Sequence, residues 1–356
     1  MQASLCNEVD PARNFTERMR AIGDGPAACA AFREGLRRLA PQLVMHPTPG
    51  CAPSAVFGSA AETARRLAAH CLPLAVAVTM HLYPLCALQC VPIPMFSAAR
   101  LQRAMLLRMI RSRSLILANA GSDRADGGHH PLIATRSADG IRVHGTCEYM
   151  SLASVADIVF FKAQLSGSGD TVLCAADLCG ESVRIGARKF TGSMRLSDTA
   201  SVTFTGHRIA RERYVIVPHE AQARCIADYQ RCWFHLLLVE THLARLDCLR
   251  RTRAVPPSAE YLVSLNELSR LREYALRLLD DYSTRGGGIE PLVSTTSAMK
   301  LRTSMLAQSM MATLHALAAC SPGDAGQLRA DATELSFIRA QPTADRKILR
   351  GLGVSL

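Results

Sequence analysis

The spacing of apolar residues changes twice along this 356-residue chain, and this change limits the folds that it can adopt. Residues 1–113 carry segments with helical spacing, residues 114–219 carry short runs rich in β-forming residues, and residues 220–356 return to helical spacing. Glycine, aspartate and serine bound the middle runs. The pattern predicts an α+β protein with an N-terminal helical domain, a middle antiparallel β-barrel domain and a C-terminal four-helix-bundle domain.

Individual elements follow from the same spacing. The first part predicts helices that include residues 26–39, 60–70 and 98–113. The middle part predicts strands at residues 132–135, 141–143, 157–161, 172–175, 201–204 and 214–217. The last part predicts helices at residues 226–252, 259–282, 294–318 and 325–339. Turn residues at 138–140 and 166–170 predict hairpins between neighbouring strands.

Residues 71–96 form a run without charge that contains four prolines. Proline interrupts the continuous helix that a lipid bilayer requires, so the run predicts buried helices joined by a turn and no membrane partner. The first twenty residues lack the basic start and apolar core of a secretory signal. Thirteen cysteines occur without a CxxC pair or zinc-finger spacing. We therefore expect a cytoplasmic protein with free thiols and no metal site.

The chain carries a formal net charge of +11, which favours an anionic partner. Five arginines lie in the predicted helix 98–113, opposite a set of apolar residues. That apolar set is Leu101, Met105, Leu106, Met109 and Ile110. Because aromatic residues that stack on bases are missing from this segment, we interpret the arginine face as solvated and expect no nucleic-acid partner.

Four stretches carry recognisable motifs. They are Asn119-Ala-Gly-Ser-Asp123, Asp139-Gly-Ile-Arg-Val-His-Gly145, Glu148-Tyr-Met-Ser151 with Ala156-Asp157, and Gly192-Ser-Met-Arg-Leu-Ser-Asp-Thr-Ala-Ser-Val-Thr-Phe204. In this order and spacing they resemble motifs of the acyl-CoA dehydrogenase superfamily of flavoproteins, which includes related flavin-dependent monooxygenases. The resemblance covers nearly the whole chain and implies the acyl-CoA dehydrogenase-like fold.

The resemblance also implies a cofactor and its contacts. It implies FAD, with Tyr149, Met150 and Ser151 against the flavin ring, which prefers an aromatic or thioether face and a hydroxyl near its reactive nitrogen. It implies that Arg250 and Arg251 hold the pyrophosphate of FAD, for which guanidinium groups are well suited. The family further implies a homodimer or homotetramer.

Substrate contacts follow in the same way. The resemblance implies that Ser122 contacts the thioester end of an acyl group carried by CoA or by an acyl carrier protein. A simple turn serine is the alternative reading of Ser122. Arg231 is a second candidate substrate contact.

The base that removes the substrate proton is missing from both positions where the resemblance places it. The C-terminal segment that matches best has Gln341, and the alternative position on the first bundle helix has Gln230. An amide has no proton-accepting state near neutral pH, so neither residue can be the base. Ordinary α,β-dehydrogenation is therefore not expected, and the flavin itself is either weakly held or lost.

The chain offers a few other titratable residues that could replace the base. His235 lies among apolar neighbours that would perturb its pKa, but it does not share a helix face with Gln230. For Glu240 we expect an ion-pair partner on another helix rather than catalysis. His129 and His130 lack a third metal ligand and predict a surface turn.

Three functions remain open at this point. The first is an oxidoreductase that acts on an acyl thioester in a biosynthetic tailoring pathway. The second is a monooxygenase of the same fold that receives reduced flavin and uses O₂, which requires no carboxylate base. The third is a flavin-free binding or redox-neutral protein that keeps the fold and its cleft.

Overall fold

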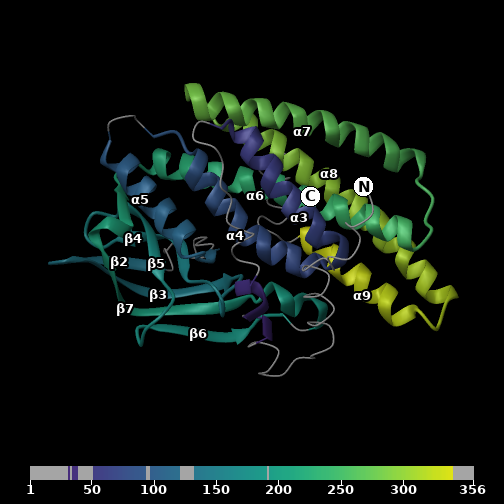
Figure 1. Cartoon of the computed structure of the whole chain (residues 1–356), viewed down its shortest axis with the longest axis horizontal. Helices are drawn as coiled ribbons and strands as arrows, with labels where there is room; N and C mark the ends of the chain where they lie inside the picture. Colours follow the sequence, from purple (N-terminus) through teal and green to yellow (C-terminus); the bar gives the residue numbers. More distant parts are fainter. Residues whose placement is uncertain are drawn as a thin grey trace, which may run out of the picture.

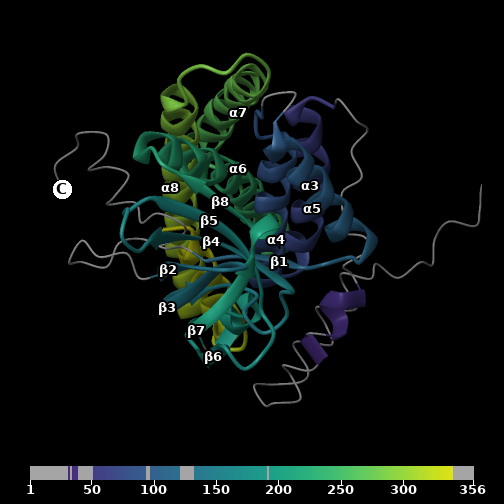
Figure 2. The same ribbon diagram turned by 90° about the vertical axis from the view of Figure 1, so that its left-hand side faces the viewer.

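The computed structural model describes residues 31–32, 34–38, 51–93, 97–120, 132–190 and 192–339, with only the backbone described for 192–194. Helices cover one side of a sheet formed by the middle of the chain (Figure 1). Figure 2, turned by a quarter, shows the strands stacked beside the helices. One continuous apolar core runs through all three parts of the chain.

Between residue 51 and the sheet, the described residues form the helices α3 (Pro53–His70), α4 (Leu72–Cys90) and α5 (Ala98–Ser112). Residues 31–32 and 34–38 are also helical. Residues Leu72–Cys90 of the uncharged run form one continuous helix, α4, so the predicted turn between helices is wrong for this part of the run, whereas the predicted burial is confirmed. Pro73 lies in the first turn, where the backbone N–H needs no helical partner, and Pro84 is accommodated within the helix. By length and composition α4 could cross a membrane, but 89% of its most apolar window is buried inside the protein.

Helix α5 buries only part of its apolar side. Leu107 and Ile110 face the core, whereas Leu101 and Met105 are 66% and 59% exposed. The arginines occupy a face that turns toward the end of α4.

Eight strands form one sheet. They are β1 (Leu117–Asn119), β2 (Leu132–Ser137), β3 (Gly140–Met150), β4 (Ile158–Leu165), β5 (Thr171–Asp177), β6 (Val183–Arg188), β7 (Ala200–Ala210) and β8 (Tyr214–Val217). The order is β6-β7-β3-β2-β4-β5-β8, with β1 on β4. Both β1 and β2 pair with β4 in parallel, so the sheet is mixed and not antiparallel as predicted. A 3₁₀ helix, η1 (Gly192–Ser197), precedes β7, and a second, η2 (Arg211–Arg213), precedes β8.

The hairpin predicted at residues 138–140 joins β2 to β3, where Ser137 pairs with Gly140. Gly140 has a φ of +153°. A Cβ at this position would lie 2.2 Å from the carbonyl oxygen of Ile209 on β7. Only glycine allows β7 to approach the turn this closely.

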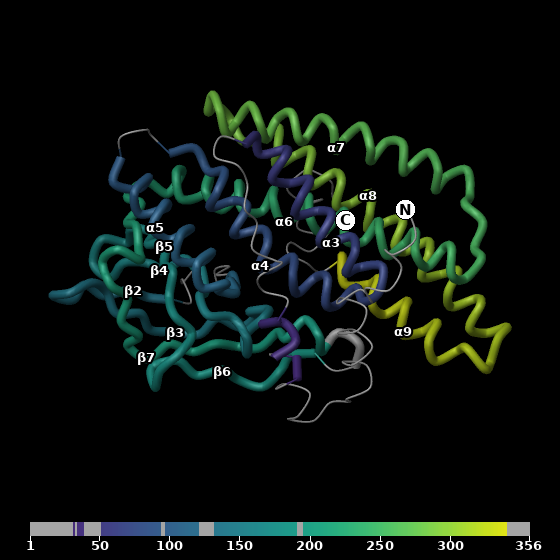
Figure 3. Tube along the Cα trace, in the orientation of Figure 1, coloured from purple at the N-terminus to yellow at the C-terminus, as the bar shows by residue number. Residues whose placement is uncertain are grey.

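The described residues of the C-terminal part form four α-helices, as predicted. They are α6 (Glu220–Thr252), α7 (Ala259–Arg285), α8 (Glu290–Cys320) and α9 (Ala325–Leu335), and α9 is followed by the 3₁₀ helix η3 (Ser336–Arg339). Their packing differs from a self-contained bundle because α3 and α4 both pack on α6, while α7 packs on α8 and α3 (Figure 3). The rings of Tyr83 on α4 and Phe234 on α6 lie 4.9 Å apart. Helix α6 is therefore covered by helices from both ends of the chain.

Candidate functional site

The three residues expected against a flavin lie at the end of β3, but only one of them faces solvent. Tyr149 is 57% exposed, whereas Met150 and Ser151 are 0% and 8% exposed. Successive side chains of a strand point to opposite faces, so Tyr149 and Met150 point apart. The exposed ring of Tyr149 can present one face to a planar ligand.

The hydroxyl of Ser151 is bound within the protein. Ser151 Oγ lies 3.0 Å from Thr199 Oγ1, which lies 2.9 Å from Ser197 Oγ. All three residues are buried, and together they join the end of β3 to η1. A contact between Ser151 and a flavin stays a prediction, and the bonds that the hydroxyl makes are structural.

Asp198 clamps the turn that follows Ser151. Its Oδ2 accepts hydrogen bonds from the backbone N and the Oγ of Ser154, at 2.8 and 2.7 Å. Its Oδ1 lies 3.1 Å from Arg188 Nη2. Burial raises the pKa of Asp198, and the bonds to Ser154 and Arg188 act in the opposite direction.

The backbone on both sides of this clamp is strained. Leu152 and Asp198 have φ values of +59° and +50°, a region that residues with a side chain rarely adopt. The backbone amides of Leu152 and Ala153 donate to the carbonyl oxygens of Ser197 and Asp198. Such strain persists only where surrounding bonds hold it, and it is concentrated at functional sites. The turn that follows Tyr149 is therefore rigidly held.

A cation lies beside the exposed ring. Lys189 Nζ is 5.4 Å from the centre of the Tyr149 ring and 2.8 Å from Glu148 Oε2. The hydrogen bond to Glu148 raises the pKa of Lys189, so the ammonium stays charged at neutral pH. An aromatic face next to a cation fits a planar ring that carries an anionic group, as a flavin nucleotide does.

Helix α4 anchors β1 behind this region. His81 Nδ1 accepts a hydrogen bond from the backbone N of Leu117 at 2.9 Å, so a neutral His81 carries its proton on Nε2. Ala120 pairs with Met150 in an isolated bridge. Ala120 belongs to the Asn119–Asp123 stretch, so the structure brings the start of that motif to the end of β3.

Asp157 ties the same region to the N-terminal part of the chain. Its Oδ2 accepts from the backbone N of Ile116 at 2.9 Å, and its Oδ1 lies 2.6 Å from Arg37 Nη2. The Ala156-Asp157 pair, singled out by the resemblance, thus has a structural role at the start of β4.

Gln230 and Arg231 lie in the first half of α6. Both are partly buried, and Arg231 pairs with Asp228 one turn earlier. Neighbouring Tyr229 is 1% exposed, and its hydroxyl lies 3.0 Å from Ser283 Oγ. The position on α6 where the resemblance places a catalytic base is therefore occupied by the amide of Gln230, next to the Arg231–Asp228 ion pair.

His235 is buried between α6 and α8. Burial lowers its pKa to about 3, with Lys300 and Arg231 acting in the same direction. Neither ring nitrogen has a hydrogen-bond partner among the described residues, and His235 is 1% exposed. The predicted perturbation is confirmed, but a ring with so low a pKa is almost never protonated at neutral pH and is a poor general acid or base.

Glu240 has the partners on other helices that the sequence led us to expect. Its Oε2 lies 2.7 Å from Arg65 Nε on α3, and its Oε1 lies 3.3 Å from Arg272 Nη1 on α7. The carboxylate is therefore structural and joins three helices.

Arg250 and Arg251 share one carboxylate. Arg250 Nη2 lies 3.2 Å from Asp247 Oδ1, and Arg251 Nη2 lies 2.7 Å from Asp247 Oδ2. They end a helix in which Gln230 lies 20 residues earlier, about 30 Å away at 1.5 Å per residue. Their expected contact with a pyrophosphate stays a prediction.

Ser122, His129, His130 and Gln341 lie outside the described residues. Among the residues that the structure does describe, no cluster of three or more histidine, cysteine or acidic side chains could hold a metal ion. None of the eleven described cysteines forms a disulfide bond.

Sequence reasoning missed the clamp made by Asp198, Ser154 and Arg188. Ser154 and Asp198 are 44 residues apart, and no local periodicity links them. The one sequence signal for this clamp was the presence of Asp198 within the fourth motif, Gly192–Phe204.

The backbone is similar to several solved structures. KijD3, solved in complex with FMN and dTDP-3-amino-2,3,6-trideoxy-4-keto-3-methyl-D-glucose, superposes on 98% of this chain and 96% of its own, with a TM-score of 0.70 and 17% identity. Dibenzothiophene monooxygenase TdsC from Paenibacillus sp. A11-2 superposes on 96% of this chain and 94% of its own, with a TM-score of 0.66 and 18% identity. TdsC has also been solved with FMN bound.

FkbI, which serves biosynthesis of the methoxymalonyl extender unit of the Fk520 polyketide, superposes on 97% of this chain and 95% of its own, with a TM-score of 0.67 and 15% identity. No protein-family model and no curated protein matches the sequence. The chain therefore has the fold shared by KijD3, TdsC and FkbI, which is the acyl-CoA dehydrogenase-like fold.

Proposed function

We propose that this protein is a flavin-dependent oxidoreductase. The observation that carries the proposal is the superposition of nearly the whole chain on KijD3 in its complex with FMN. The exposed ring of Tyr149 beside Lys189 supports it, because that pair offers a face and a charge that suit a flavin nucleotide. A bound flavin would supply two-electron transfer or, when reduced, reaction with O₂.

The residues of the chain would act by positioning. Tyr149 would pack against one face of the flavin ring, and the Asp198 clamp would keep the following turn in place. FMN is the flavin that we propose, because Arg250 and Arg251, expected to bind the pyrophosphate of FAD, both pair with Asp247. FAD is the alternative outcome of the same binding experiment.

Monooxygenation is the reaction that we favour. Removal of a proton next to a thioester needs a base, and Gln230 cannot accept a proton. Oxygenation with reduced flavin needs no such carboxylate, and TdsC, which shares the fold, is a monooxygenase. Oxidation of an acyl group on CoA or an acyl carrier protein, by a homodimer or homotetramer, is the second candidate, supported by the net charge of +11.

Flavin binding tests the proposal. The purified full-length protein would be titrated with FMN, FAD and riboflavin, with quenching of flavin fluorescence as the readout. We expect FMN to bind more tightly than riboflavin, and a protein that binds none of the three would refute a flavoenzyme. With a flavin reductase and NADH, product formation that depends on O₂ would distinguish a monooxygenase from an acyl thioester dehydrogenase, which would instead reduce an electron acceptor anaerobically.

A further inference from the structure

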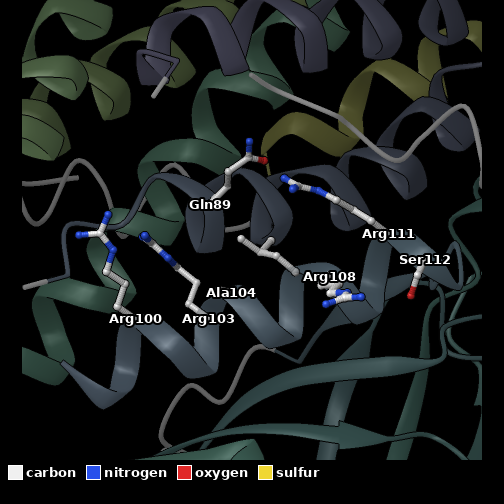
Figure 4. A pocket seen from close by; sticks show the side chains of 8 residues that line it. Gln89, Arg100, Arg103, Ala104, Arg108, Arg111 and Ser112 are labelled. Carbon is white, nitrogen blue, oxygen red and sulfur yellow. The ribbon is translucent and has the colours of Figure 1, made fainter. Parts of the chain in front are cut away.

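A groove lies between the C-terminal end of α4 and the length of α5 (Figure 4). Its volume is about 510 Å³, and its walls include Gln89, Arg100, Arg103, Arg108 and Arg111. No acidic residue is among the eight that line it. This volume lies within the usual range of small-molecule sites.

The four arginines share one face of α5. At 100° per residue, positions 100, 103, 108 and 111 fall within an arc of about 140°. From the first to the last the helix rises by about 16 Å, at 1.5 Å per residue. The groove therefore presents an extended row of guanidinium groups, not a single cation.

Within the residues that the structure describes, no carboxylate neutralises this positive charge. None of the four arginines forms an ion pair with a carboxylate in the described part of the chain, although many other arginines do. Arg103 Nη1 donates to the carbonyl oxygen of Val91 at 2.7 Å. Burial and then the charge of Arg100 lower the pKa of Arg103 from its usual value, which fits two neighbouring cations.

Two polar atoms at one end of the groove have unmet hydrogen-bonding capacity. Gln89 Oε1 and Arg111 Nε are buried, and neither has a partner among the described residues. Figure 4 shows the Arg111 side chain reaching toward Gln89, while Arg100 and Arg103 lie side by side at the other end. Buried groups of this kind usually meet a ligand or water.

We propose that the α4–α5 groove binds the diphosphate group of a small phosphorylated ligand. Guanidinium groups bind phosphate oxygens in pairs, and a row of about 16 Å exceeds what one phosphate can contact. A nucleoside diphosphate and CoA both carry this group. The proposal does not depend on flavin binding, because it rests on residues other than those around Tyr149.

Calorimetric titration of the full-length protein tests the proposal. Inorganic pyrophosphate, ADP and CoA would each be titrated in about 0.15 M salt, where screening suppresses loose surface attraction. We expect Arg111→Gln to weaken the binding of ADP about tenfold, because a charge-assisted hydrogen bond is lost. The matched control is Arg113→Gln, which removes the same charge two residues away at an exposed position outside the groove and should weaken binding less than twofold.

The outcomes separate cleanly. Binding that Arg111→Gln weakens and Arg113→Gln spares supports the site, and a tenfold preference for CoA over ADP, or the reverse, identifies the source of the diphosphate. Equal losses in both variants, or no binding of any of the three probes, would overturn it. If Arg111→Gln weakened the binding of FMN as much as that of ADP, the proposal would also be overturned, because the groove would then bind the flavin phosphate. If Arg111→Gln does not fold, the exposed lining residue Arg108 replaces it as Arg108→Gln.

Discussion

Asp198 accepts two hydrogen bonds from Ser154 through a single carboxylate oxygen, one from the backbone and one from the hydroxyl. The other oxygen pairs with Arg188, so one buried side chain joins β6, η1 and the turn after β3. The Ser154 end of this clamp lies five residues after Tyr149, and the clamp holds a turn with strained backbone at Leu152 and Asp198.

Removal of the clamp should destabilise the protein. We expect Asp198→Ala to lower the free energy of unfolding by about 3 kcal/mol, because Ser154 and Arg188 lose a buried charged acceptor. Urea unfolding monitored by circular dichroism measures the change. Asp281→Ala, which removes an exposed partner of Arg285, should cost less than about 1 kcal/mol, and equal effects of the two variants would contradict the clamp.

The exposed ring of Tyr149 should matter for binding and not for stability. Tyr149→Ala should weaken FMN binding about fivefold, since a stacking contact contributes about 1 kcal/mol, whereas Tyr149→Phe should bind FMN normally. Fluorescence titration gives the affinities, and thermal melting should show an unchanged midpoint because the ring is 57% exposed. Tyr274→Ala, at an exposed position on α7, is the control, and an unchanged affinity in Tyr149→Ala would exclude stacking on this ring.

Arg65 touches two carboxylates that should differ in their contribution. Glu240 is 4% exposed and Glu62 is 63% exposed in their side chains. Glu240→Gln should lower the free energy of unfolding by about 3 kcal/mol, because Arg65 and Arg272 lose a buried counter-charge. Glu62→Gln should cost less than about 1 kcal/mol in the same urea titration. A smaller effect at position 240 than at position 62 would show that Glu240 is not a structural ion pair.

His235 should make stability depend on pH. Its folded pKa, about 3, lies below the usual 6.5, so the unfolded chain binds a proton that the folded chain does not as pH falls below 6.5. Between pH 7 and pH 5 this should lower the free energy of unfolding by about 2 kcal/mol. His242, whose pKa is lowered to about 4 mainly by burial, acts in the same direction.

His235→Leu tests this dependence because it removes the titrating ring. The difference in unfolding free energy between pH 7 and pH 5 should shrink by about 2 kcal/mol relative to the unchanged protein. His315→Gln, at an exposed position on α8, should leave the difference unchanged. A pH dependence that survives in His235→Leu would place its origin elsewhere.

Local pattern was enough to predict most of the elements. The short run at residues 132–135, bounded by turn residues, was the signal that marked β2. The structure adds the alternation of buried Leu132, exposed Ile133 and buried Ala134. Strand β6 carries no such signal, because the side chains from Arg184 to Ala187 are all exposed. Strand β1 has three residues and exists through its parallel pairing with β4, a contact between distant segments. Elements of this kind depend on the tertiary structure.

Properties of the site could be predicted only for residues whose neighbours in the sequence determine their surroundings. The apolar neighbours of His235 indicated a perturbed pKa, and the structure confirms it. The missing aromatic residues led us to interpret the α5 arginines as a solvated face, and the sequence does not show that the end of α4 lies opposite four of them. Likewise, nothing local joins Ser154 to Asp198 across 44 residues.

The position of helix α6 between the two ends of the chain determines how the helical part unfolds. It is one unbroken rod of 33 residues, flanked by α3 and α4 from the start of the chain and by α8 from its end. Cutting the polypeptide between α5 and β1 would leave α6 with a bare apolar flank in one fragment and strip α3 and α4 of their cover in the other. Neither fragment could fold stably without reassociating with the other. We therefore expect α3, α4, α6 and α8 to unfold together in one cooperative transition, although they are far apart in the sequence.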